Sequence, residues 1–139
     1  MDKVAKTSLN QIVARTGLYP VEAFEFVRAG LAVTAQKVYP DIENRSESRQ
    51  HVSGRQLCLG LRDFAIRRYG LLAKAVLYHW NVRRTADFGR IVFAMIEANL
   101  MRKTSEDSIE DFNDIFDFEA AFEPPHRPSG PSETEFNLR

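Results

Sequence analysis

Apolar residues recur every three or four positions through most of the chain, which is the spacing of one face of an α-helix. Ser8 and Gln11 have the spacing of a helix-capping box, and Gly17 predicts the end of that first helix. A second helix is expected to begin at Pro20 and to run to residue 38, with a break near Gly30. No alternation of apolar and polar residues lasts longer than four residues, so no strand is predicted.

Further helices are predicted after a polar loop at residues 41–52. Ser53 and Gln56 form a second capping box, in which each side chain can satisfy a backbone N–H of the other residue. The helix that they open is expected to end near Gly70. A shorter helix is expected over residues 71–80, which extends the all-α pattern.

Two segments share the pattern Asp-Phe-x-x-Ile: DFGRIVF at residues 87–93 and DFNDIF at residues 111–116. We interpret each as the start of a helix, in which a hydroxyl residue caps the first turn and an acidic residue follows near the positive end of the helix dipole. Thr85 is the expected cap of the first helix. Ser108 is the expected cap of the second, an acidic helix of residues 108–118.

The triplet Asp-Phe-Gly at residues 87–89 also occurs in protein kinases, where the aspartate binds Mg²⁺. The Gly-rich loop, the strand lysine and the catalytic loop of a kinase are all missing, and 139 residues are too few for that fold. Gly89 is instead expected to let a neighbouring segment pack closely against the helix.

The length of 139 residues predicts one domain, and 44% hydrophobic and 27% charged residues are ordinary values for a globular protein. The predicted fold is a compact all-α bundle of five to seven helices over residues 1–122. A Pro-rich tail at residues 123–139 is predicted to be disordered. Asn81 and Asn99 are expected to close helices, because asparagine tolerates the left-handed backbone that ends a helix.

A cytoplasmic location without a membrane anchor is the expectation from the sequence. The single cysteine, Cys58, allows no intramolecular disulfide, which suits a reducing compartment. The first residues lack the apolar core of a signal peptide, and no apolar run approaches the roughly 18 residues that a membrane helix needs.

Charge is distributed unevenly although the net charge is zero. Residues 1–53 carry 7 basic and 6 acidic groups, residues 54–103 carry 10 basic and 3 acidic groups, and residues 104–139 carry 2 basic and 10 acidic groups. The basic segment 54–103 and the acidic helix expected within residues 104–122 can attract each other. The basic segment can also form a binding surface for which the acidic segment competes, or both can be solvated helix faces.

Arginines outnumber lysines in the basic segment, and guanidinium groups make bidentate contacts with phosphate or carboxylate. The possible binding surface consists of Arg62, Arg67, Arg68, Arg83, Arg84 and Arg90. Residues 71–101 have the outline of a helix-turn-helix motif, which would make the helix that begins at Thr85 a DNA-reading helix. That helix is apolar over much of its surface, which is more typical of a helix in the core.

No motif of a catalytic nucleophile, a phosphate-binding loop or a metal site occurs, so no catalytic residue, cofactor or metal is predicted. Cys58 is expected to be a partly buried structural thiol and not a nucleophile. The acidic residues 106–117 lack the spacing of an EF-hand loop. A weaker alternative is an enzyme whose site is assembled from His51, Arg62 and Asp87.

Several stretches between residues 9 and 122 together carry a family resemblance. They are Tyr19-Pro20-x-Glu22-Ala23-Phe24-x-Phe26-Val27, Gly30-Leu31, His51-Val52-Ser53-Gly54-x-Gln56-Leu57, Gly60-Leu61-Arg62, Gly70-x-x-Ala73-x-x-Val76-Leu77-x-x-Trp80, Thr85-x-Asp87-Phe88-Gly89, Ile91-Val92-Phe93 and Lys103-Thr104-x-x-Asp107-x-x-x-Asp111-Phe112. The chain resembles a family of small, functionally uncharacterised proteins from planctomycete and verrucomicrobial bacteria, with Asn81 and Asn99 in place of expected glycines. The resemblance implies a bacterial, cytoplasmic, single compact domain, and no activity or cofactor.

The sequence therefore predicts a non-enzymatic intracellular binding or regulatory module, and another protein is the expected partner. A nucleic-acid-binding protein that uses the arginines of residues 54–103 is the alternative, and the enzyme is the weaker one.

Overall fold

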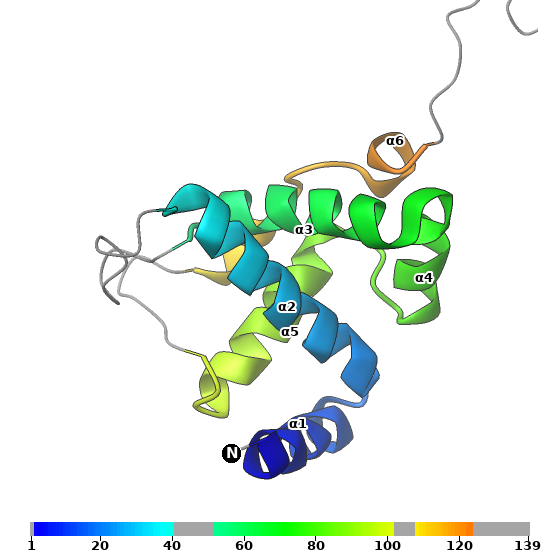
Figure 1. Ribbon diagram of the computed structural model, residues 1–139. Coiled ribbons are helices and arrows are strands. Elements are labelled where there is room, and N and C mark those ends of the chain that lie inside the picture. The colour runs from blue at the N-terminus through cyan, green and yellow to red at the C-terminus, as the bar shows by residue number, and fades with distance from the viewer. Residues whose placement is uncertain (1, 41–51, 102–107, 124–139) are drawn as a thin grey trace, which may run out of the picture.

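The computed structural model is built from helices (Figure 1). It describes residues 2–40, 52–101 and 108–123, and side chains only from residue 9 onward. Within these ranges the chain forms six α-helices, two 3-10 helices and no strand, namely α1 (Asp2–Thr16), α2 (Val21–Val38), α3 (Gly54–Tyr69), η3 (Gly70–Leu72), α4 (Ala73–His79), α5 (Thr85–Glu97), η4 (Ile109–Phe112) and α6 (Phe118–Ala121). The predicted all-α bundle is confirmed.

Helices α2, α3 and α5 surround the centre of the bundle. In Figure 1, α2 crosses in front of α5, α3 lies across the top of both, α1 covers the lower end, and α4 folds back beneath the right-hand end of α3. The apolar stripes of these helices meet in one core, whose largest fully buried side chains include Phe24, Leu61, Leu77, Phe88, Ile91 and Met95. Burial of these stripes is the main force that holds the helices together.

Two glycines let α2 and α3 approach each other closely. A Cβ atom added to Gly60 on α3 would lie 2.0 Å from the hydroxyl of Thr34, and one added to Gly30 on α2 would lie 2.3 Å from a methyl of Leu61. The prediction that Gly30 breaks the helix is therefore wrong, since α2 continues past it and uses it for packing. The Thr34 hydroxyl donates to the carbonyl of Gly30 at 2.8 Å, so this buried hydroxyl is satisfied.

Several predicted helix ends are confirmed. Gly17, Asn81 and Asn99 have φ values of 63°, 67° and 63°, the left-handed conformation that ends a helix. Ser53 and Gln56 form the predicted capping box, with both hydrogen bonds at 3.0 Å.

The first helix begins earlier than predicted. Helix α1 starts at Asp2, so Ser8 lies inside the helix and does not cap it. Pro20 is the residue immediately before α2, one position ahead of its predicted place.

The acidic C-terminal helix is the largest error of the sequence-based prediction. Residues 108–123 form η4 and the four-residue α6 instead of one helix over residues 108–118, and residues 104–107 lie outside the described ranges. The helical path stops at Asn113, whose backbone is extended with φ −77° and ψ 131°, and Asp114 follows in a left-handed conformation with a φ of 52°. Ser108 is the N-cap of η4, as predicted, and Asp117 caps α6 by accepting from the backbone N–H of Ala120 at 3.0 Å.

The two Asp-Phe segments pack against each other through α5 and η4. The Thr85 hydroxyl donates to the carbonyl of Phe112 at 2.6 Å and accepts from the backbone N–H of Ile115 at 3.1 Å. Thr85 is therefore the first residue of α5 and not its cap, which corrects the prediction. The prediction for Gly89 is confirmed, because a Cβ atom there would lie 2.8 Å from the Cβ of Phe112.

Residues 41–51 of the predicted loop and the predicted disordered tail from residue 124 onward lie outside the described ranges, and so do residues 102–107. The predictions for these segments stay predictions. Among the described helices, none is both long and apolar enough to span a lipid bilayer.

We predict that Gly89→Ala destabilises the protein by about 1–3 kcal/mol, because the added methyl overpacks the contact with Phe112. Alanine has a better helix propensity than glycine, worth about 1 kcal/mol, and would by itself stabilise α5. A net loss of stability would therefore indicate the steric contact with Phe112. Urea unfolding of Gly89→Ala, of Phe112→Gly and of the double variant measures the effect. Phe112→Gly removes the Cβ and the ring that the added methyl would meet, so in that background the methyl should cost less than about 0.5 kcal/mol, and an equal cost in both backgrounds would contradict the contact.

Candidate functional site

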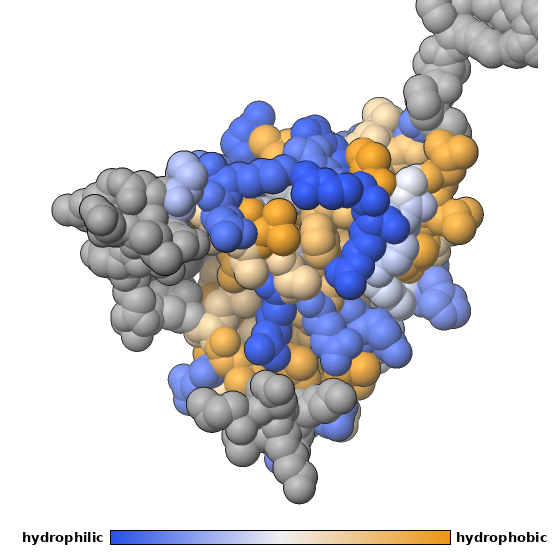
Figure 2. Space-filling view, viewed as in Figure 1, coloured by the Kyte–Doolittle hydropathy of each residue, from blue (hydrophilic) through white to orange (hydrophobic). Residues whose placement is uncertain are grey.

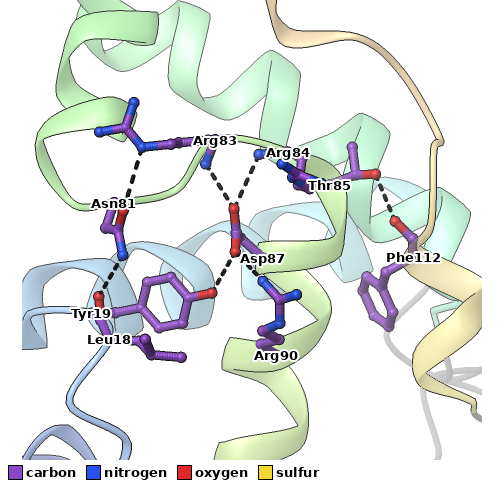
Figure 3. Close-up of polar contacts among 9 residues, drawn as sticks. All are labelled: Leu18, Tyr19, Asn81, Arg83, Arg84, Thr85, Asp87, Arg90 and Phe112. Atoms are coloured by element: carbon purple, nitrogen blue, oxygen red, sulfur yellow. Dashed lines mark hydrogen bonds and ion pairs between the residues drawn. The ribbon is translucent and has the colours of Figure 1, made fainter.

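The buried carboxylate of Asp87 lies at the centre of a polar cluster (Figure 3). One oxygen, Oδ1, accepts from the Tyr19 hydroxyl at 2.5 Å and from Nη1 of Arg90 at 2.6 Å. The other, Oδ2, accepts from the backbone N–H groups of Arg83 and Arg84 at 2.8 and 3.2 Å. Asp87 is only 6% exposed, and these four donors compensate the cost of burying its charge. We call these five residues the Asp87 cluster.

Tyr19 connects the Asp87 cluster to the turn between α1 and α2. Burial, followed by the hydrogen bond to Asp87, raises the pKa of Tyr19 to about 12, so the hydroxyl remains a donor at neutral pH. A second hydrogen bond joins this turn to the segment that precedes α5, because the side-chain amide of Asn81 donates to the carbonyl of Leu18 at 3.1 Å. The cluster therefore fixes α5 against the N-terminal helices.

The hypothesis of an enzyme site at His51, Arg62 and Asp87 gains no support from this geometry. The hydrogen-bond donors of Asp87 do not include Arg62, whose Nε instead lies 3.0 Å from the carboxylate of Asp63. His51 lies outside the described residues. Asp87 thus has a structural role that its four partners explain.

The predicted arginines are spread over three elements. Arg62, Arg67 and Arg68 belong to α3, Arg83 and Arg84 to the turn before α5, and Arg90 to α5 itself. Three guanidinium groups lie over aromatic rings: Arg62 over Phe116 at 5.9 Å, Arg68 over Phe64 at 5.2 Å and Arg83 over Tyr78 at 4.9 Å. Such contacts orient a guanidinium group without neutralising its charge.

Among the described residues, the ion pair between the basic segment and the acidic segment 108–123 is made by a lysine and not by an arginine. Lys74 on α4 lies 2.8 Å from Glu119 on α6, and the hydroxyl of Tyr78 donates to the same carboxylate at 3.1 Å. This pair is exposed and contributes little to stability. In the described part of the chain, no predicted arginine forms an ion pair with an acidic residue of segment 108–123.

Helix α5 has the environment of a core helix. Phe88, Ile91, Val92 and Met95 are buried, and further apolar side chains of the helix pack against the core. A helix buried in this way cannot enter the major groove of DNA, which disfavours the helix-turn-helix interpretation of residues 71–101.

Three large apolar side chains are exposed where α3 turns into α4. Leu71 and Leu72 on η3 are 72% and 65% exposed, and Ile66 on α3 is 43% exposed. We call these three residues the apolar corner, and Figure 2 shows hydrophobic surface at this right-hand end of α3. Arg67 and Arg68, both exposed, lie beside them in sequence.

A shallow groove of about 230 Å³ lies between α2 and α3. Its apolar lining comes from Val33, Val38, Leu59 and Phe64, and Figure 2 shows a hydrophobic floor between hydrophilic side chains on this face. Among its charged lining residues are Lys37, Asp63 and Arg67. We call this feature the α2–α3 groove.

Sequence reasoning did not identify the apolar corner, because it assigned residues 71–80 to one helix. The sequence did contain an indication of this exposure. Ala73, Leu77 and Trp80 are separated by four and three residues, as on one buried helix face, and Leu71 and Leu72 do not lie three or four residues before Ala73. Tyr19 had no signal of its own, since it lies 68 residues from Asp87.

The described residues include neither a metal-binding group nor a reactive thiol. No three His, Cys, Asp or Glu side chains of these residues are placed to hold a metal ion. Cys58 is fully buried, more so than predicted, and burial raises the pKa of its thiol to about 12, which keeps it protonated and unreactive.

Comparisons of the chain with protein-family models, with curated proteins and with solved structures found no match. The resemblance to the planctomycete and verrucomicrobial family therefore stays a prediction.

We predict that Asp87→Asn destabilises the fold by about 2–4 kcal/mol, because the amide nitrogen would face donors in either orientation of the side chain. Asp63→Asn is the matched control. It removes an exposed ion pair and should change the free energy of unfolding by less than about 1 kcal/mol. Chemical denaturation measures both variants, and equal small effects would contradict a structural role for the Asp87 cluster.

Proposed function

We propose that the protein is a non-enzymatic intracellular binding module that binds another protein through the apolar corner. The observation that carries the proposal is the exposure of two adjacent leucines, Leu71 and Leu72, on an ordered helical turn. Contiguous exposed apolar residues mark interaction surfaces in many proteins. Burying one such side chain against a partner is worth about 1.5–3 kcal/mol.

The shape and charge of this region fit a contact with a protein. The turn η3 joins the ends of two helices, so Leu71 and Leu72 are held on a rigid scaffold and lose little freedom when they bind. Arg67 and Arg68 shortly precede them in the sequence and are exposed, and arginine is enriched among the residues that dominate binding energy at interfaces. A partner pocket with an apolar floor and an acidic rim would complement this surface.

The two leucines are dispensable for the fold, which makes the proposal testable. Neither belongs to the buried core, unlike Ala73 and Leu77 in the next turns of the chain. Substitution should therefore separate binding from stability. Leu18, 50% exposed and located in the turn between α1 and α2, provides a control of the same residue type.

We predict that Leu71→Ser/Leu72→Ser lowers recovery of the binding partner by about tenfold or more, with an unchanged circular dichroism spectrum. The measurement is affinity capture with the tagged full-length protein, quantified by mass spectrometry against Leu18→Ser, which should recover the partner at the wild-type level. The proposal fails if the double variant and the wild type recover the same proteins in equal amounts. It also fails if the wild type captures nothing reproducibly.

Nucleic-acid binding is a second candidate function, supported by the exposure of Arg67, Arg68 and Arg84. None of these three arginines forms an ion pair with a residue that the structure describes. Guanidinium groups without an acidic partner are available for phosphate oxygens. This candidate does not use α5 as a reading helix, so it predicts contacts to the phosphate backbone without base specificity.

For this candidate we predict an electrophoretic shift with short single- or double-stranded DNA at about 50 mM salt, and its loss at several-fold higher salt. Arg67→Glu/Arg68→Glu should weaken the shift more than Arg15→Glu, which changes a basic residue at the end of α1. Absence of any shift at low salt would exclude the candidate and leave the apolar corner unaffected.

A further inference from the structure

The two helices that form the α2–α3 groove are held in place by their close packing against each other. Gly60 and Thr34 line it at the point where the two helices meet, and their close contact leaves the helices no room to move together. The groove is therefore open in the unbound protein, and a ligand would not have to displace any helix. A preformed site avoids the energetic cost of rearrangement on binding.

The size of the groove restricts what it can hold. Its volume of about 230 Å³ is below the range of roughly 300–1,000 Å³ that is typical of pockets for drug-sized ligands. A single aromatic or large aliphatic side chain would fill it and would meet the apolar surfaces of Val33, Leu59 and Phe64. Insertion of one such anchor is the usual way in which a peptide segment uses a small groove.

The charges around the groove indicate the character of such a peptide. Lys37 and Arg67 are exposed, and neither forms an ion pair with any residue in the described ranges. Asp63, which also lines the groove, is already paired with Arg62 at 3.0 Å. The cations that remain unpaired are therefore complementary to carboxylates on either side of an apolar anchor.

We propose that the α2–α3 groove binds an acidic peptide segment of another protein. One aromatic or large aliphatic side chain of the peptide occupies the groove, and flanking carboxylates contact Lys37 and Arg67. This site goes beyond the apolar corner. Arg67 borders both surfaces, but neither proposal requires the other.

The test is a titration of the ¹⁵N-labelled full-length protein with a blocked peptide of sequence Glu-Glu-Phe-Glu-Glu, followed by amide chemical shifts. We expect shifts that saturate at peptide concentrations of about 1 mM and that cluster at groove residues such as Val33, Leu59 and Phe64. Glu-Glu-Ala-Glu-Glu and Lys-Lys-Phe-Lys-Lys serve as controls. Each should bind about tenfold more weakly, because one lacks the anchor and the other reverses the charge.

Two protein variants complete the test. Lys37→Glu/Arg67→Glu should abolish the shifts, whereas Arg15→Glu/Arg28→Glu, which reverses two exposed arginines that do not line the groove, should retain them. Leu71→Ser/Leu72→Ser should also retain them, so failure of the apolar corner is distinguishable from failure of the groove.

Three results would overturn the proposal: no shifts up to several millimolar peptide, equal binding of the alanine peptide, or shifts spread over all basic surfaces. Shifts of the same groove residues on raising the protein concentration alone would show a second copy of this chain in the groove, and would overturn it too.

Discussion

The carboxylate of Asp87 accepts hydrogen bonds from two backbone amides and two side chains, which come from three parts of the chain. Its charge is buried, so every donor that it lost would leave a costly unsatisfied group. Tyr19 brings the N-terminal turn to this carboxylate, and Arg83 and Arg84 bring the segment that precedes α5 (Figure 3). The start of α5 is thereby fixed in one position, and the apolar contacts of the core form around it.

The same two turns of α5 hold the C-terminal segment through different residues. Thr85 binds the backbone on both sides of the turn that follows η4, and Gly89 receives the ring of Phe112. DFGRIVF and DFNDIF pack on each other in the fold, with Gly89 of the first segment against Phe112 of the second.

Local features of the fold were predictable from sequence, and contacts between distant residues were not. Gly17 and Asn81 end helices because of their own backbone preferences, which neighbours do not alter. The partnership of Tyr19 with Asp87 spans 68 residues and left no periodic signal. The predicted acidic helix was wrong because the backbone becomes extended at Asn113, and the hydrogen bond of the Ile115 N–H to Thr85, 30 residues away, is part of this non-helical path. For the candidate site, the arginines were identifiable, but the exposure of the leucines depended on which helix faces become buried.

The proposed binding module needs a rigid interior that holds the exposed cations and leucines in place, and we infer that this rigidity depends on the Asp87 cluster. Hydrogen exchange of the backbone amides of Arg83 and Arg84 tests this dependence most directly, because both precede α5 and have no helical partner. The account predicts that they exchange as slowly as the core amides of α5, with the free energy of global unfolding. Exchange at the rate of an open loop would contradict it.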